Sequence, residues 1–365
     1  MDTKRPEEDA AVLKAKCPRR LSGHRPVAVR ERLAALAALP EAELGADTYG
    51  DGGAVAVVEE TVAGLLGKPA CIFLPKGIIA QLAVLRTWSE NRGRVAIGLH
   101  PQSHIEVDEG GAYSAIHGLR GVRLGADGAP FGASDLVAVR EKLAAVVVEL
   151  PLRRCAFQMP DWSELLAMVS WCDAHGSALH MDGARLWECG PGYGRSYPEI
   201  CEIFDSVYVS FYKGLGGLGG AAIAGGSDFI AETRIWLHRQ GAHPYRSYPY
   251  ALAALEGLRR HLPKMGDYHA RAVELSEALR TAGLRTTLAQ TNSFQVWLPI
   301  SASAAVQGQV ALARARGVWL LERVIPTVVP SGIAVEVQIG EAAEDLGSPE
   351  IITLFEELIS FAQAA

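Results

Sequence analysis

Short apolar runs alternate with amphipathic stretches over most of the chain. Six runs rich in apolar and β-branched residues predict strands: ACIFLP, RVAIGL, LAAVVVELP, SALHMDGA, SVYVSFY and GAAIAGG. Between the third and fourth lies DWSELLAMVSWCDAHG, whose apolar positions recur at helical spacing and predict a helix. Strands that alternate with helices favour an α/β fold, with a mostly parallel sheet flanked by helices.

The pattern differs on either side of this alternating region. Residues 1–45 predict a polar leader and a helix over RPVAVRERLAALAAL, and a turn follows at TYGDGG. Residues 46–265 form the expected large α/β domain. After Pro263 the pattern becomes helix, strand, helix, strand pair and helix, so residues 266–365 predict a small C-terminal α+β domain.

Composition narrows the class of protein. No apolar run among the 365 residues approaches the roughly 20 residues that span a bilayer. The N-terminal residues lack the short apolar core of a secretory signal, so we expect a soluble protein of the cytoplasm. A net charge of −6 argues against sequence-independent nucleic-acid binding. The cysteines form no C-x-x-C pair and are expected to be buried free thiols rather than metal ligands: Cys17, Cys71, Cys155, Cys172, Cys189 and Cys201.

Polar residues end two of the predicted strands, where open parallel sheets bind their ligands. Asp182 and Arg185 follow SALHM, and Ser210 and Lys213 end SVYVSFYK, which runs into a glycine-rich stretch. A lysine beside tightly packed glycines is partly desolvated, which lowers its pKa toward the neutral amine that forms a Schiff base. An ionised carboxylate such as Asp182 would keep a heteroaromatic nitrogen protonated, so that the ring acts as an electron sink.

Other interpretations of these motifs are weaker. A single lysine after a strand is usually a surface charge, and a single D-G-A-R is usually a loop. The stretch Gly214 to Gly219 matches G-x-G-x-x-G, but AAIAGG after it predicts a strand rather than a helix, so we reject a nicotinamide site. No G-x-x-x-x-G-K-[ST] loop supports nucleoside triphosphate binding.

Four segments resemble one enzyme family in the family's order: DTYGDGGAVAVVEETVAGLLGKPACIFLPKG, SHIEVDEGGA, LHMDGARLWE and SFYKGLGGLGG. The chain resembles the threonine aldolase and β-eliminating lyase group of fold-type I pyridoxal-phosphate enzymes from about residue 45 to 260. The resemblance implies that Lys213 holds pyridoxal 5'-phosphate as a Schiff base and that Asp182 pairs with the pyridine nitrogen. Arg185 would contact the cofactor's phenolic oxygen or the substrate carboxylate, and His104 would stack on the ring and move protons.

Candidates for the cofactor phosphate follow from the same resemblance. Gly77 and Ser210 would contact the phosphate, and backbone N–H groups at a helix start after Gly77 would be ready anion donors. Lys76 and Ile78 stand where the family has small hydroxyl residues, so binding would depend on the backbone or on Lys76. Arg246 would come from a neighbouring subunit, and we expect a homodimer or homotetramer.

Substrate-facing positions depart from the family. The family's histidine after the central strand is replaced within ELPLRR, and no C-terminal arginine stands in SGIAVEVQIG. Arg153 could supply the missing charge to a substrate carboxylate, and Tyr49 resembles the tyrosine at the edge of the family's active site. An exposed arginine pair is more often only solvated, and an aromatic residue in a turn is as often only packed.

The function expected from these residues is aldol cleavage of a β-hydroxy-α-amino acid, such as threonine, into glycine and an aldehyde. The departures leave a second reaction at the same substrate carbons open, such as β-elimination. A third possibility from another class is a catalytically silent homologue that serves as a binding protein. No metal is expected.

Overall fold

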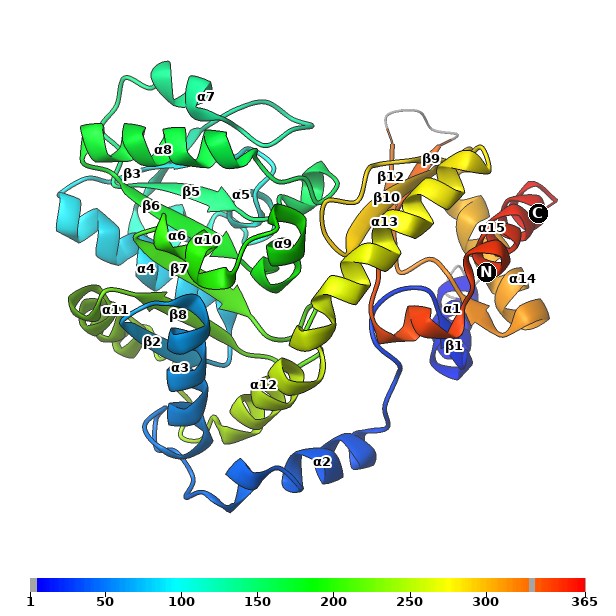
Figure 1. Cartoon of the computed structure of the whole chain (residues 1–365), viewed down its shortest axis with the longest axis horizontal. Helices are drawn as coiled ribbons and strands as arrows, with labels where there is room; N and C mark the ends of the chain where they lie inside the picture. The colour runs from blue at the N-terminus through cyan, green and yellow to red at the C-terminus, as the bar shows by residue number, and fades with distance from the viewer. Residues whose placement is uncertain (1–4, 328–331, 365) are drawn as a thin grey trace. The chain divides into compact units, whose positions relative to one another are not determined.

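The computed structural model describes residues 5–327 and 332–364. The chain divides into two compact units (Figure 1). We call Arg30–Pro263 the large unit, and Met1–Val29 together with Lys264–Ala365 the small unit.

A seven-stranded sheet forms the centre of the large unit, in the order β2-β8-β7-β6-β5-β3-β4. Strands β3 to β7 are parallel, whereas β8 is antiparallel to both of its neighbours. The strands are β2 (Ala70–Leu74), β3 (Ala96–Leu99), β4 (Arg120–Arg123), β5 (Ala145–Glu149), β6 (Ala178–Gly183), β7 (Ser206–Ser210) and β8 (Ala221–Gly225). All six predicted strands are confirmed, and the mostly parallel sheet is confirmed with them. Strand β4, RGVR, was missed because a single valine between arginines gives no apolar signal.

Helices α3, α4, α6, α8 and α11 contact this sheet (Figure 1). The helices of this part of the chain are α2 (Val29–Ala37), α3 (Gly53–Leu66), α4 (Gly77–Arg92), α5 (His104–Val107), α6 (Ala112–His117), α7 (Ala133–Val137), α8 (Trp162–His175), α9 (Leu186–Tyr193), α10 (Tyr197–Glu202), α11 (Ser227–Arg239) and α12 (Tyr248–Arg260), with short 3₁₀ turns η1 (Pro40–Glu43) and η2 (Arg153–Cys155). The helix predicted over DWSELLAMVSWCDAHG is α8. Helix α4 packs on β7, β8 and α11, where the Trp88 ring stacks on Phe229 with 4.4 Å between ring centroids. Because helices cover the sheet, every residue of β5, β6 and β7 is buried.

The small unit combines a four-stranded antiparallel sheet, in the order β12-β13-β10-β9, with a parallel pair of β1 and β11. Its elements are α1 (Arg5–Lys16), β1 (Arg19–Arg20), α13 (Met265–Thr281), β9 (Arg285–Thr286), β10 (Ser293–Leu298), α14 (Ala302–Arg316), β11 (Val318–Trp319), β12 (Arg323–Pro326), β13 (Ile333–Gln338), η4 (Glu341–Asp345) and α15 (Ser348–Gln363). The 3₁₀ turn η3 (Leu262–Lys264) spans the point in the sequence where the large unit ends and the small unit resumes. Because β1 pairs with β11, the first 29 residues belong to this unit. The division into a leader, a large domain and a small domain, with boundaries at residues 45 and 265, stays a prediction.

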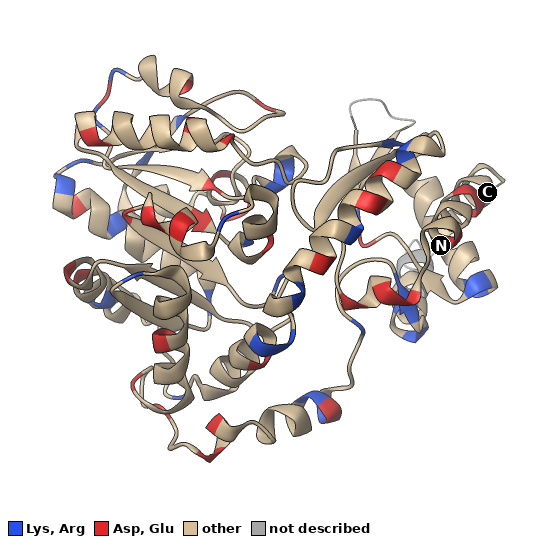
Figure 2. Cartoon of the chain, in the orientation of Figure 1, with Lys and Arg blue, Asp and Glu red and all other residues tan. Residues whose placement is uncertain are grey.

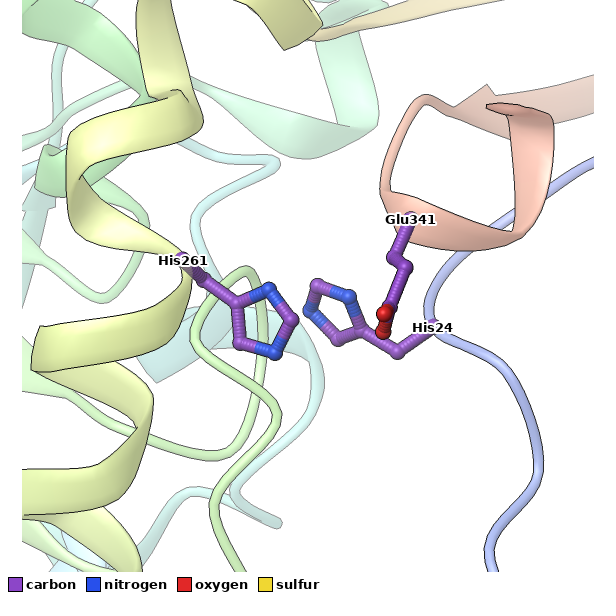
Figure 3. Close-up of side chains that lie close together, drawn as sticks. All are labelled: His24, His261 and Glu341. Carbon is purple, nitrogen blue, oxygen red and sulfur yellow. The ribbon is translucent and has the colours of Figure 1, made fainter.

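Charged side chains bind the N-terminal segment of the small unit to its C-terminal part. Arg25 donates to Asp345 at 2.7 Å and lies 3.1 Å from Glu341. The side chains of His24 and Glu341 lie together, with a ring nitrogen of His24 within 4.8 Å of a carboxylate oxygen of Glu341 (Figure 3). Acidic and basic residues are interspersed over the elements of both units (Figure 2).

The structure also bears on the state predicted for the cysteines and on whether a helix could cross a membrane. All six cysteines are buried and free, as the sequence predicted. Within residues 5–327 and 332–364, none of the helices combines the length and the apolar character that a membrane crossing requires.

Candidate active site

The carboxyl ends of three neighbouring strands bring charged side chains together in the large unit. Glu149 ends β5, Asp182 lies near the end of β6, and Lys213 follows β7 by three residues. Glu149 and Asp182 are register partners across β5 and β6, so their backbones lie side by side. The edge at which parallel strands end is therefore the place where the sequence predicted a site.

Asp182 and Lys213 line one cavity of about 130 Å³, which we call the central cavity. Six of the predicted residues line it: Lys76, Gly77, Ile78, His104, Asp182 and Lys213. A narrow extension of the central cavity is lined by Arg153, Arg185 and Glu149 beside His104, Asp182 and Lys213. The fold thus gathers most of the predicted residues from segments up to 137 positions apart.

Lys213 is largely buried, and its surroundings favour the neutral form of its amine. Burial, followed by the positive charge of Arg185, lowers the pKa of Lys213 to about 8, against the opposing effect of Asp182, Glu149 and Glu188. An amine with this pKa is neutral in about a tenth of the molecules at pH 7, far more than an ordinary lysine, and the neutral amine is the form that attacks an aldehyde.

Asp182 is 2% exposed and is fixed by the chain around it. Its carboxylate accepts a hydrogen bond from the Ala184 backbone N–H at 3.2 Å, and its carbonyl accepts one from the Leu150 N–H at 2.9 Å. Its position one residue before the end of a buried parallel strand leaves little freedom of movement. The carboxylate is therefore held at a fixed position in the wall of the central cavity.

His104 begins α5 and is oriented by a buried carboxylate that sequence reasoning missed. Its Nδ1 lies 3.1 Å from Oε1 of Glu109, whose side chain is 3% exposed. This hydrogen bond raises the pKa of His104, and burial raises the pKa of Glu109. With its proton on Nδ1, neutral His104 keeps Nε2 free to accept a proton. The motif SHIEVDEGGA contained the pair, but their contact depends on the α5 turn.

Two more buried carboxylates were missed. Glu149 accepts hydrogen bonds from the backbone N–H groups of His104 at 2.7 Å and Arg153 at 3.2 Å, so it joins two cavity segments. Burial raises its pKa to about 7, and burial also raises that of Glu188 to about 7. Glu149 could have been found, because an acid ends the predicted strand LAAVVVELP. Glu188 ends the segment LHMDGARLWE, but its burial depends on how α9 packs.

Arginines line the extension of the central cavity. The Arg185 guanidinium lies over the Phe157 ring at 5.5 Å and its Nε lies 3.9 Å from Glu188. Arg153 is buried, at 9% exposure, whereas its neighbour Arg154 forms a bidentate pair with Asp108 at 2.6 and 3.1 Å. The buried Arg153 contradicts the interpretation of an exposed, merely solvated arginine pair.

The first turn of α4 forms another wall. Lys76 is the N-cap residue and no side chain caps the helix, so the N–H groups that follow are available to an anion. At Gly77 a Cβ atom would overlap the hydroxyl of Tyr208, so only glycine fits there. Backbone groups can thus approach a ligand closely at this turn.

Three predicted residues do not line the central cavity or its extension. The Ser210 hydroxyl is buried and donates to the Ala184 carbonyl at 2.7 Å. Arg246 donates to the Asp47 carbonyl and to the Thr48 hydroxyl. Tyr49 is 60% exposed and packs edge-on against Tyr245, with 5.3 Å between ring centroids. Within one chain these three side chains have other partners.

Comparison with known proteins places the chain among its relatives. The family model described as beta-eliminating lyase matches residues 32–299. A solved structure from Listeria monocytogenes, provisionally assigned as an L-allo-threonine aldolase, is 31% identical with a TM-score of 0.91 and covers 98% of this chain and 99% of that one. The low specificity L-threonine aldolase of Escherichia coli O157:H7 is 27% identical over 270 residues, which cover 72% of this chain and 80% of that relative.

A more distant neighbour bears on the fold alone. A structure described as SPT with PLP is 17% identical with a TM-score of 0.68, and covers 92% of this chain and 83% of that one. The predicted fold-type I architecture is thereby confirmed. The chain belongs to the beta-eliminating lyase family, whose enzymes are lyases that depend on pyridoxal phosphate.

Proposed function

We propose that the protein is an aldolase that cleaves a β-hydroxy-α-amino acid of the threonine type into glycine and an aldehyde, with pyridoxal 5'-phosphate as cofactor. The observation that carries the proposal is the placement of Lys213 and Asp182 at the ends of adjacent parallel strands, in the wall of one cavity. Relatives named threonine aldolase support the substrate class.

The residues present fit the cofactor. Lys213 would be its covalent attachment point, because its lowered pKa provides a nucleophilic amine. The buried carboxylate of Asp182 would pair with the ring nitrogen. The uncapped first turn of α4, at Gly77 and Ile78, would hold the phosphate with Lys76 beside it.

The chain's own residues account for the remaining requirements of the reaction. The cofactor, when bound, supplies the electron sink for the bond that breaks. His104 Nε2 would accept the proton of the substrate β-hydroxyl, while Glu109 holds the ring by Nδ1 and stabilises its positive charge afterwards. Arg185 and Arg153, from the extension of the central cavity, would bind the substrate carboxylate.

The proposed assembly is at least a homodimer. An apolar groove of about 450 Å³ on the large unit is lined by Leu33, Leu36, Leu44 and Leu252. Arg246, a candidate for the phosphate, lies away from the cavity of its own chain, as a residue donated to a second copy would. Leu44→Asp should produce monomers in analytical ultracentrifugation and reduce activity; an unchanged sedimentation coefficient would contradict this arrangement.

The cytoplasmic location stays a prediction.

The central experiment measures attachment and cleavage together. Protein incubated with pyridoxal phosphate and borohydride should carry the cofactor's mass on the tryptic peptide that contains Lys213, and threonine should yield glycine and acetaldehyde. Lys213→Ala should lose both properties. Lys68→Ala, which removes a half-buried lysine that donates to the Phe204 carbonyl, should lose neither.

Three outcomes would redirect the proposal. Ammonia and pyruvate from serine, without aldehyde from threonine, would assign β-elimination instead of aldol cleavage. Labelling of another lysine, or wild-type turnover by Lys213→Ala, would refute the site itself. A protein that takes up cofactor and turns over none of these amino acids would be the silent homologue.

A further inference from the structure

The side chain of Glu149 caps two short helical turns in the wall of the site. Its Oε2 accepts the backbone N–H of His104 at 2.7 Å, and its Oε1 accepts the backbone N–H of Arg153 at 3.2 Å. His104 is the first residue of α5, and Arg153 is the first residue of η2. The N–H groups of a first helical turn have no partner within the helix, so each turn requires an acceptor from elsewhere.

Neither turn is capped by the residue that precedes it. Ser103 precedes α5, but its hydroxyl makes no capping hydrogen bond to that turn. Leu152 precedes η2 and has no polar side chain. One carboxylate therefore takes the place of both caps, with one oxygen for each turn. Because Glu149 ends β5, whose residues are all buried, the central sheet fixes the position of this carboxylate.

A second contact joins the same two turns. Asp108 is the C-cap residue of α5, and Arg154 is the middle residue of η2. The Arg154 guanidinium donates to both carboxylate oxygens of Asp108. Since α5 and η2 are joined through Glu149 and through this ion pair, they carry His104 and Arg153 as one body.

The backbone at the end of η2 is strained and needs such an anchor. Ala156 and Phe157 have φ angles of 57° and 60°, a conformation that residues other than glycine adopt at an energetic cost and that persists only where the surrounding structure fixes it. The Phe157 ring also lies under the Arg185 guanidinium. The segment that Glu149 holds at Arg153 thus contacts both arginines of the extension of the central cavity.

We propose that Glu149 is a positioning residue, which sets the distance between His104, the proton acceptor, and Arg153, which binds the substrate carboxylate. This inference rests on the proposed function, which gives those two residues their roles. Glu149 acts through the two turns rather than on the substrate. A displacement of about 1 Å in a reacting group can cost a hundredfold in rate, so a shared cap on the two turns has a direct effect on turnover.

The charge of Glu149 allows positioning to be separated from electrostatics. Its neighbours across the sheet edge are Asp182 of β6 and Lys213 after β7, and at pH 8, above its pKa of about 7, Glu149 is mostly ionised. By charge alone, a neutral residue at this position should favour an anionic substrate and lower KM. Loss of the cap displaces Arg153 and should raise KM instead. The sign of the change in KM therefore distinguishes the two roles.

The test measures kcat and KM for threonine cleavage by the full-length, cofactor-loaded protein at pH 8. Glu149→Gln keeps one acceptor oxygen but places its amide donor against the other N–H, so kcat should fall about tenfold and KM should rise about fivefold. Glu149→Asp keeps the charge but is one methylene too short to reach both turns, and should show the same changes. Wild-type kcat and KM in Glu149→Asp would assign the role to charge and overturn positioning.

A second measurement needs neither cofactor nor turnover. Hydrogen exchange followed by mass spectrometry should show faster exchange in Glu149→Gln than in the wild type, both in residues 103–108 and in residues 152–156, because one carboxylate protects both turns. Acceleration in only one of these segments, or in neither, would overturn the shared cap.

The matched control is Glu59→Gln. Glu59 on α3 is another enclosed glutamate whose carboxylate accepts a backbone N–H, that of Phe73 at 2.8 Å, and burial raises its pKa to about 7 as well. Its replacement should change the stability to urea and leave kcat and KM for threonine unchanged. A role of Glu149 in folding alone would give this same pattern in Glu149→Gln.

The outcomes separate this inference from the proposed function. Wild-type protein that does not cleave threonine would refute both. Wild-type protein that cleaves threonine, while Glu149→Gln keeps the wild-type kcat or shows an unchanged or lower KM, would overturn only the role of Glu149. If Glu149→Gln fails to fold, Asp108→Asn, which weakens the second contact between the same turns, decides the question: kcat should again fall and KM rise, and wild-type values would overturn the inference.

Discussion

Replacing Glu188 by glutamine should make the cofactor-free protein more stable at alkaline pH. The side chain is 3% exposed, and its Oε2 makes no hydrogen bond with the described residues. The Arg185 Nε lies 3.9 Å from its Oε2, too far for a close ion pair. Glutamine has the same size and keeps an acceptor oxygen toward Gly214, where a Cβ would overlap the carboxylate.

The magnitude follows from the pKa. Burial raises the pKa of Glu188 to about 7, from an ordinary value of 4.5. Between these two values the folded protein binds more protons at this site than the unfolded chain does, so its stability falls as the pH rises. Above pH 7 the ionised Glu188 costs roughly 3 kcal/mol of folding free energy. Glutamine does not ionise and avoids this cost.

Urea unfolding between pH 5 and 8 measures the effect. We expect Glu188→Gln and the wild type to have similar free energies of unfolding at pH 5, and the variant to exceed the wild type by roughly 3 kcal/mol at pH 8. Glu60→Gln, an exposed change on α3, should follow the wild type at both pH values. A difference between Glu188→Gln and the wild type that does not grow with pH would refute the reasoning.

Three further changes test other parts of the site. Glu109→Gln removes the hydrogen-bonded charge that raises the pKa of His104, so the acidic limb of the pH–kcat profile should move to lower pH; an unmoved limb would exclude His104 as the base. Gly77→Ala should raise the cofactor Kd by about tenfold because the methyl group meets the Tyr208 hydroxyl, and Tyr208→Phe in the same chain should restore binding in dialysis. Asp47→Ala removes a buried carboxylate that accepts from three backbone N–H groups, and should lower the free energy of urea unfolding by about 2 kcal/mol.

Much of the fold and the centre of the site could be predicted from the sequence alone. Six of the seven strands of the large unit were predicted because buried strands are short, continuous apolar runs, whereas β4 was missed because it is not one. Lys213 and Asp182 were recognisable because each follows such a run, and parallel strands end at the same edge of their sheet. The assignment of this chain to its family depended on the same segments.

The contacts that adjust these residues were decided only by the tertiary structure. The partner of His104 is set by the α5 turn, and Glu188 lies beside Arg185 only because α9 follows β6 closely. Arg246 and Ser210 have other partners within one chain, which no motif reveals. A strand's apolar pattern is local, whereas burial, hydrogen-bond partners and the resulting pKa values depend on segments that meet only when the chain has folded.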